Sequence, residues 1–210
     1  MLDMGTDQNS KEKLILKAAE EEFMQKGFDG AKTTKIAARA GVTHAMLHYY
    51  YRTKENLFNK VLDDKLGIMI ETIFSSFRDL KVPFLDKIKI AIEAHFDFFV
   101  QNPDLPRFVV NELISKPERR KILEDKIGII TGMLLIQLQK EADEATETGL
   151  MRKINILDVM IDIASLNLFV FVALPILKSS AVVAYGGEDE FLKARRRENV
   201  EMIMCRLRKN

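Results

Sequence analysis

The segment from Thr33 to Phe58 holds the side chains of this sequence that are best suited to bind another molecule. Its hydroxyl, imidazole and ammonium groups can each hydrogen-bond a phosphate or a base edge of double-stranded DNA. Ala45 and Met46 suit a thymine methyl group, and the histidines suit a base acceptor or a phosphate. The candidate DNA-contact residues are Thr33, Thr34, Thr43, His44, Ala45, Met46, His48, Tyr49, Tyr50 and Lys54.

The charge around this segment also favours an anionic partner. The whole chain has a formal net charge of only +1, but the stretch from Lys26 to Lys60 contains seven basic residues and two acids. Contact with DNA phosphates requires such a local excess of positive charge. We therefore expect a basic patch on the unit that carries these residues.

Two short helical patterns on either side of Gly41-Val42-Thr43 position the candidate residues. The first runs from Thr34 to Ala40 and puts its apolar residues on one face. Gly41 can adopt a positive φ and end that helix, and Thr43 is a good N-cap for a second helix from His44 to about Tyr50. This pattern predicts a helix-turn-helix, whose second helix enters the DNA major groove. Thr53 can cap the next helix.

The sequence does not favour metal binding or catalysis by these residues. His44 and His48 are four residues apart and share a helix face, but no further ligand lies close in the sequence. The chain has no serine nucleophile elbow, glycine-rich phosphate loop or HExxH sequence. We therefore predict no metal site, no cofactor, no catalytic residue and no enzymatic activity.

Residues 10–60 resemble the DNA-binding domain of the TetR family of bacterial transcriptional regulators. The resemblance rests on Thr33-Thr34, Ile36-Ala37, Ala40-Gly41-Val42-Thr43, Leu47, Tyr50 and Lys54-Glu55-Asn56-Leu57-Phe58. It implies that Thr34, Tyr50 and Lys54 contact phosphates. It also implies a homodimer in which the last two helices of each protomer form a four-helix bundle. Ala45, Met46, His48 and Tyr51 depart from residues common in the family, so no operator sequence is carried over.

The sequence predicts an all-α fold. Its N-terminal three-helix DNA-binding domain should cover residues 1–58, and a larger helical domain for ligand binding and dimerisation should cover 59–210. Asn9 with Glu12 resembles a capping box at the start of the first helix, which Gly27 should end. Further helices are expected at 54–80, 83–101, 105–115, 118–146, 154–178 and 188–208, and Pro175 should kink or end the helix that contains it.

A small-molecule effector site is predicted from apolar and aromatic positions of the second domain. The candidate residues are Phe74, Phe77, His95, Phe98, Phe99, Phe108, Met133, Asn167 and Phe171. Simple tight packing explains the same pattern, and His95 also fits a hydrogen-bonded core histidine. The helix from Lys54 either transmits a movement between the domains or merely connects them.

The remaining features favour a cytoplasmic regulator. Cys205 is the single cysteine, the N-terminus lacks a signal-peptide pattern, and the apolar run from Ile163 to Leu177 is too short and interrupted to span a membrane. The expected partners are a double-stranded DNA operator, an effector and a second copy of the chain. The alternative is a helical ligand-binding or partner-binding protein whose DNA binding is secondary or lost.

Overall fold

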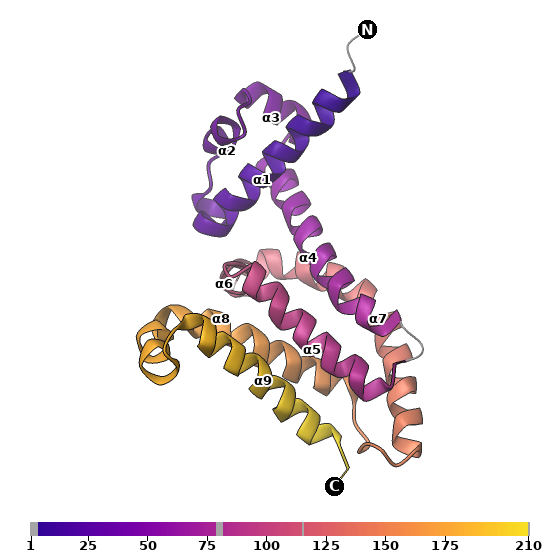
Figure 1. Ribbon diagram of the computed structural model, residues 1–210. Helices are drawn as coiled ribbons and strands as arrows, with labels where there is room; N and C mark the ends of the chain where they lie inside the picture. The colour runs from indigo at the N-terminus through magenta and orange to yellow at the C-terminus, as the bar shows by residue number, and fades with distance from the viewer. Residues whose placement is uncertain (1–3, 79–81, 115, 210) are drawn as a thin grey trace. The chain divides into compact units, whose positions relative to one another are not determined.

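The computed structural model describes residues 4–78, 82–114 and 116–209. The named elements in these ranges are all helices, which confirms the predicted all-α class (Figure 1). The chain divides into two compact units, the first ending at Met69 and the second beginning at Ile70. This structural boundary lies further along the chain than the predicted one after Phe58.

The first unit packs its helices around an aromatic core. It contains α1 (Met4–Gly30), α2 (Thr33–Arg39), α3 (His44–Tyr51) and the first part of α4 (Lys54–Arg78). Phe58 of α4 is fully buried, and its ring lies 5.1 Å from Phe23 and 5.0 Å from Phe28, both nearly perpendicular to it. Edge-to-face pairs of this kind stabilise a core beyond their buried area. The contacts between these rings therefore hold α1, at the start of the unit, against α4, at its end.

The start of α1 differs from the prediction. The helix already includes Met4, so Asn9 is not its N-cap. No proline interrupts the preceding residues, so the helix can propagate back through them. The predicted break at Gly27 is confirmed, because this residue has φ 67° and ψ 178° within the assigned helix.

The second unit is a helical bundle built on α5 (Phe84–Gln101), α7 (Pro117–Glu147), α8 (Ile156–Tyr185) and α9 (Glu188–Leu207). In this bundle α5, α8 and α9 lie side by side (Figure 1). The core side chains are apolar and come from all four helices; they include Ile88, Ile92, Leu138, Val159, Ile203 and Leu207.

Two helix boundaries of the second unit were predicted wrongly. Residues 105–115 were expected to form one helix, but α6 (Leu105–Phe108) passes into a wider π-helical turn, η1 (Val109–Ile114). The helix expected at 154–178 runs from Ile156 to Tyr185, where Gly186 caps it with φ 79°. Pro175 removes one backbone hydrogen bond, but buried Leu174 and Ala181 on either side hold the helix against the bundle.

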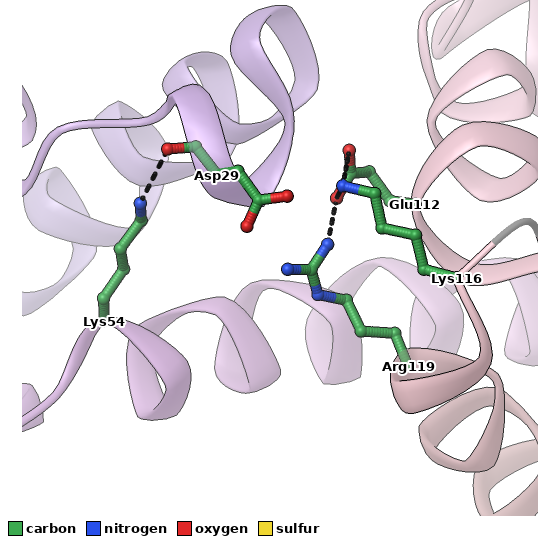
Figure 2. A network of polar contacts seen from close by, with 5 residues as sticks. All are labelled: Asp29, Lys54, Glu112, Lys116 and Arg119. Atoms are coloured by element: carbon green, nitrogen blue, oxygen red, sulfur yellow. Dashed lines mark hydrogen bonds and ion pairs between the residues drawn. The ribbon is translucent and has the colours of Figure 1, made fainter.

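Ion pairs fix the helices of this unit against one another. Arg196 of α9 donates two 2.8 Å hydrogen bonds to Asp97 of α5, which is a bidentate pair of the strong kind. Lys87 of α5 is buried and donates to Glu141 of α7 at 3.0 Å. Figure 2 shows a third group, in which Lys116 and Arg119 both donate to buried Glu112 of η1. The last two groups keep the buried charges of Lys87 and Glu112 compensated.

Among the described residues, α8 has the length and composition of a membrane-spanning helix. It nevertheless carries polar side chains that bond within the unit. Asn167 is fully buried and donates to the Ile92 carbonyl oxygen at 3.0 Å, and Asp162 pairs with Arg206 of α9. One face of α8 therefore belongs to the protein core, and its opposite face is exposed and apolar.

Candidate functional site

The turn between α2 and α3 has the geometry of a helix-turn-helix. Gly41 has φ 67°, a value that favours glycine, and the Val42 amide donates to the Ala37 carbonyl at 3.0 Å. Thr43 caps α3, because its hydroxyl oxygen accepts a hydrogen bond of 3.1 Å from the Met46 amide. The predicted turn and cap are both confirmed.

The inner face of α3 anchors the helix and leaves an outer face exposed. Leu47 and Tyr51 are buried, with 3% and 7% of their surface exposed, against the rest of the first unit. The candidate residues that are exposed are Thr34, Thr43, His44, Ala45, His48 and Tyr49, and those that are half-buried are Thr33, Met46, Tyr50 and Lys54. The outer face can thus present histidine, tyrosine and small side chains to a groove.

A hydrogen bond ties the beginnings of α2 and α3 together. The Thr33 hydroxyl oxygen and Nε2 of His44 lie 3.0 Å apart. One ring nitrogen of His44 is therefore engaged within the protein, and only Nδ1 is left for a base or a phosphate. The bond holds two predicted contact residues in a fixed relation before any DNA arrives.

Lys54 stands at the first turn of α4, beyond the Thr53 cap. The Thr53 hydroxyl accepts from the Asn56 amide at 3.0 Å. The Lys54 ammonium donates to the Asp29 carbonyl at 3.4 Å, as Figure 2 shows, and it lies 4.8 Å from the centre of the Phe28 ring. An ammonium has three N–H donors, so this one bond leaves donors for a phosphate. The same contacts hold the side chain in place.

Internal ion pairs compensate part of the predicted basic patch. Arg39 lies 3.3 Å from Glu21, and Lys60 lies 2.8 Å from Asp64. Lys26, Lys32 and Lys35 are exposed and form no ion pair with another described residue. The positive charge that remains for DNA is smaller than the sequence count indicates, and Lys35 of α2 contributes to it.

Sequence reasoning counted Arg52 as a basic residue but did not identify its conformation. This exposed arginine between α3 and α4 has φ 61°, which is unusual for a residue other than glycine. Its amide donates to the His48 carbonyl at 2.9 Å and so ends α3. In the sequence, only the position of Arg52 between Tyr51 and the Thr53 cap indicates this conformation. The Arg52 side chain is exposed directly after α3.

The candidate effector residues of α5 and α8 form a buried cluster. His95 lies 4.6 Å from Phe99 between ring centres, Phe99 lies 5.7 Å from Phe171, and Phe98 lies 6.2 Å from Phe99. Phe108 is buried in α6. The side chains of Phe74, Phe77 and Met133 lie outside what the structure describes. The structure therefore brings together the aromatic candidates of these two helices around His95.

Two surface grooves of the second unit lie elsewhere. One of about 810 Å³ lies between α7 and the start of α8, where Ile136, Gln139 and Leu157 line it. Another of about 610 Å³ lies between α5 and α9 and includes Lys89, Arg197 and Cys205. Neither groove is lined by the predicted aromatic residues, and the effector-site assignment stays a prediction.

Burial lowers the pKa of His95 from 6.5 to about 4, because the charged imidazole loses its hydration. The unfolded chain should bind a proton below pH 6.5 while the folded chain does not. Folding stability should then fall as the pH drops from 6.5 towards 4. At pH 5 this single group should cost about 2 kcal/mol relative to pH 7.

Denaturant unfolding at pH 7 and pH 5 measures that loss. His95→Gln removes the titration, so the variant should lose about 2 kcal/mol less stability between the two pH values than the wild type. His48→Gln is the matched control, because His48 is exposed. Equal pH dependence in the His95 variant and the wild type would contradict the neutral buried imidazole.

The comparison with known families agrees with this geometry. Residues 15–61, which include α2, α3 and the start of α4, match the model of the family described as bacterial regulatory proteins, tetR family. The fatty acid metabolism regulator protein of Bacillus subtilis is 25% identical over 145 residues, which cover 66% of this chain and 74% of that protein. The transcriptional regulator RutR of Escherichia coli K12 is 28% identical over 136 residues, which cover 59% of this chain but only 62% of RutR.

Solved structures extend the likeness to the second unit. A protein from Streptomyces coelicolor described as a transcriptional regulator has a TM-score of 0.69 at 22% identity, covering 94% of this chain and 98% of its own. The ketosteroid transcriptional regulator KstR2 of Mycobacterium tuberculosis has a TM-score of 0.66 at 16% identity, covering 95% of each chain. At these identities the structures share the fold. The match of residues 15–61 to the family model, together with the relatives named as transcriptional regulators, supports a regulator of the TetR family.

Proposed function

We propose that this regulator is a ligand-responsive repressor that binds an inverted-repeat operator as a homodimer in the cytoplasm and leaves it when a small apolar or amphipathic effector binds. The observation that carries the proposal is the outer face of α3, which is exposed while Leu47 and Tyr51 anchor its inner face. A capped helix that presents histidine and tyrosine side chains beside uncompensated lysines suits major-groove reading with phosphate contacts.

The exposed apolar face of α8 supports the dimer. Phe169, Ile176 and Val183 have 66%, 84% and 88% of their surface exposed, and their spacing puts them along one side of the helix. An exposed apolar surface of this size calls for a partner. A second copy, paired through α8 and α9, would bury this face on both chains by the same twofold contact. Because α8 makes buried hydrogen bonds within the unit, a second copy of the protein is favoured over lipid as the partner of this face.

Release by an effector requires that it bind the two states of the dimer with different affinity. A tenfold loss of operator affinity needs a coupling free energy of about 1.4 kcal/mol. The aromatic cluster around His95 supports an apolar or amphipathic ligand. Two of the similar proteins are named a fatty acid metabolism regulator and a ketosteroid transcriptional regulator, and fatty acids and ketosteroids are largely apolar molecules, which fits this class.

Lys54→Ala should weaken binding to every duplex, because the ammonium contacts a phosphate and not a base. We expect a several-fold loss of affinity that is alike across sequences, and a salt slope smaller by about one. Fluorescence anisotropy with several duplexes measures both. Lys60→Ala is the matched control on the same helix, because Lys60 already pairs with Asp64, and it should change affinity less than about twofold. A changed base preference at unchanged affinity would refute the phosphate role.

Duplex binding as a function of salt tests the proposed function against the partner-binding alternative. A regulator that neutralises several phosphates should lose at least about tenfold in affinity between 50 and 200 mM salt. The measurement uses the full chain and a random-sequence duplex of about three helical turns. A folded protein whose duplex binding is absent, or independent of salt, would favour the alternative.

A further inference from the structure

Four side chains form a continuous chain of hydrogen bonds through the second unit. Arg195 Nη2 donates to Asn199 Oδ1 at 2.7 Å, and Asn199 Nδ2 donates to Asn167 Oδ1 at 2.9 Å. Asn167 Nδ2 lies 3.0 Å from the Ile92 carbonyl oxygen and 3.2 Å from Nδ1 of His95. Both asparagines are fully buried. The chain of bonds connects α9 through α8 to α5.

The two ends of this chain of bonds fix its direction. A guanidinium can only donate, so the oxygen of Asn199 must face Arg195 and its amide nitrogen must face Asn167. A carbonyl can only accept, so the nitrogen of Asn167 must face Ile92. If the side-chain amide of either asparagine were rotated by 180°, two hydrogen-bond donors or two acceptors would face each other.

The direction determines which nitrogen of His95 carries the proton. Nδ1 faces the amide nitrogen of Asn167 and must accept, so it is unprotonated. The neutral imidazole therefore carries its hydrogen on Nε2. Protonation of Nδ1 would place its hydrogen against the Asn167 amide. The bonded neighbours thus select one neutral tautomer, and burial acts in the same sense.

The remaining donor, Nε2–H, has no hydrogen-bond acceptor among the described residues, although 7% of the His95 surface is exposed. The ring of Phe99 lies 4.6 Å from the imidazole, and Phe171 continues the aromatic surface. Nε2 is not among the fully buried side-chain atoms that lack a partner, so this donor reaches the exposed part of His95 and is available to an acceptor from a ligand.

We infer that Nε2–H of His95 is the polar recognition group of the effector site, and that the effector places a neutral acceptor oxygen, such as a ketone or ester carbonyl, against it. This inference rests on the proposed ligand-responsive function and names the chemical class of the ligand. An ammonium ligand would place its own N–H donor against Nε2–H of His95, so no hydrogen bond could form. A carboxylate would need a compensating cation, and none of the described contacts of His95 is with a cation.

Asn167 and Asn199 are positioning residues in this account, since they act through His95. Nitrogen NMR of histidine-labelled protein tests that role, because the two ring nitrogens report their own protonation. We expect unprotonated Nδ1 and protonated Nε2 for His95 at pH 7, with the signal assigned by its loss in His95→Gln. Asn167→Leu should release the constraint and give a mixture of tautomers. A wild-type His95 that carries its hydrogen on Nδ1 would overturn the inference.

Three probes of equal chain length separate the ligand classes: 2-undecanone, undecanoate and undecylammonium. We expect the ketone to shift the His95 Nε2 signal and to bind tightest. In His95→Phe, which keeps an aromatic ring, its affinity should fall about tenfold, corresponding to one hydrogen bond of about 1.4 kcal/mol. Leu150→Phe, which adds an aromatic ring at an exposed position of the second unit, is the control and should bind the ketone as the wild type does.

Equal ketone binding by His95→Phe and the wild type, or no shift of the Nε2 signal, would overturn the inference. Tighter binding of undecylammonium than of the ketone would also contradict it. Salt-dependent duplex binding is measured on the same preparations without probe. If duplex binding is intact but the ketone neither shifts the His95 Nε2 signal nor loses affinity in His95→Phe, the inference fails and the regulator function stands. If duplex binding is itself absent, the proposed function fails.

Discussion

Ile176→Asp should convert the dimer into a monomer. Ile176 lies on the exposed face of α8 with 84% of its surface exposed in the single chain, so the substitution leaves the fold of the protomer intact. In a twofold dimer the aspartate is buried twice, once in each copy. Burial of an unpaired carboxylate costs several kcal/mol, so dimerisation should weaken by at least about a hundredfold. Sedimentation equilibrium measures the change.

Leu150→Asp is the matched control, because this leucine has 66% of its surface exposed but precedes α8 in a loop. It should leave the dimer unchanged. The monomeric variant should also lose binding to an inverted repeat, since one reading helix reaches only one half-site. A dimer of unchanged strength in Ile176→Asp would show that α8 is not the contact between protomers.

Phe58→Ala should unfold the DNA-binding unit while the rest of the protein stays folded. The Phe58 side chain is 2% exposed and contacts both Phe23 and Phe28 edge to face. Truncation of a buried phenylalanine costs about 3–5 kcal/mol, a large share of the stability of a small unit. We expect loss of duplex binding and of the helical signal of this unit, with dimerisation retained.

Phe58→Leu keeps most of the volume and should cost less than about 1.5 kcal/mol, so its duplex binding should survive at low temperature. Circular dichroism melting and sedimentation separate the two units in both variants. Full duplex binding by Phe58→Ala at wild-type melting temperature would refute the assignment of this aromatic core.

The helix-turn-helix could be predicted from the sequence because each of its signals is local. Gly41 adopts the positive φ that its position requires, and Thr43 and Thr53 accept the bonds expected of N-caps. Leu47 is buried, as its spacing on the helix indicates. These features depend on residues within about one helical turn of each other. The sequence therefore suffices to predict them without knowledge of the tertiary structure.

Features that depend on tertiary contacts could not be predicted. Pro175 disfavours helix locally, yet the packing of α8 carries the helix past it to Tyr185. The bond from Asn199 to Asn167 joins residues of two helices, whose contact the sequence pattern does not indicate. The compensation of Arg39 by Glu21 of α1 likewise required the fold. Such pairings follow from how helices pack, which periodicity alone leaves undetermined.

Selection of bound duplexes from a random pool, at two salt concentrations, tests the central claim most directly. A dimeric reader should recover an inverted repeat whose half-sites lie about one helical turn or somewhat more apart, with fewer survivors at the higher salt. Recovery of no preferred sequence by a folded dimer would contradict the account, because the exposed face of α3 would then not read DNA.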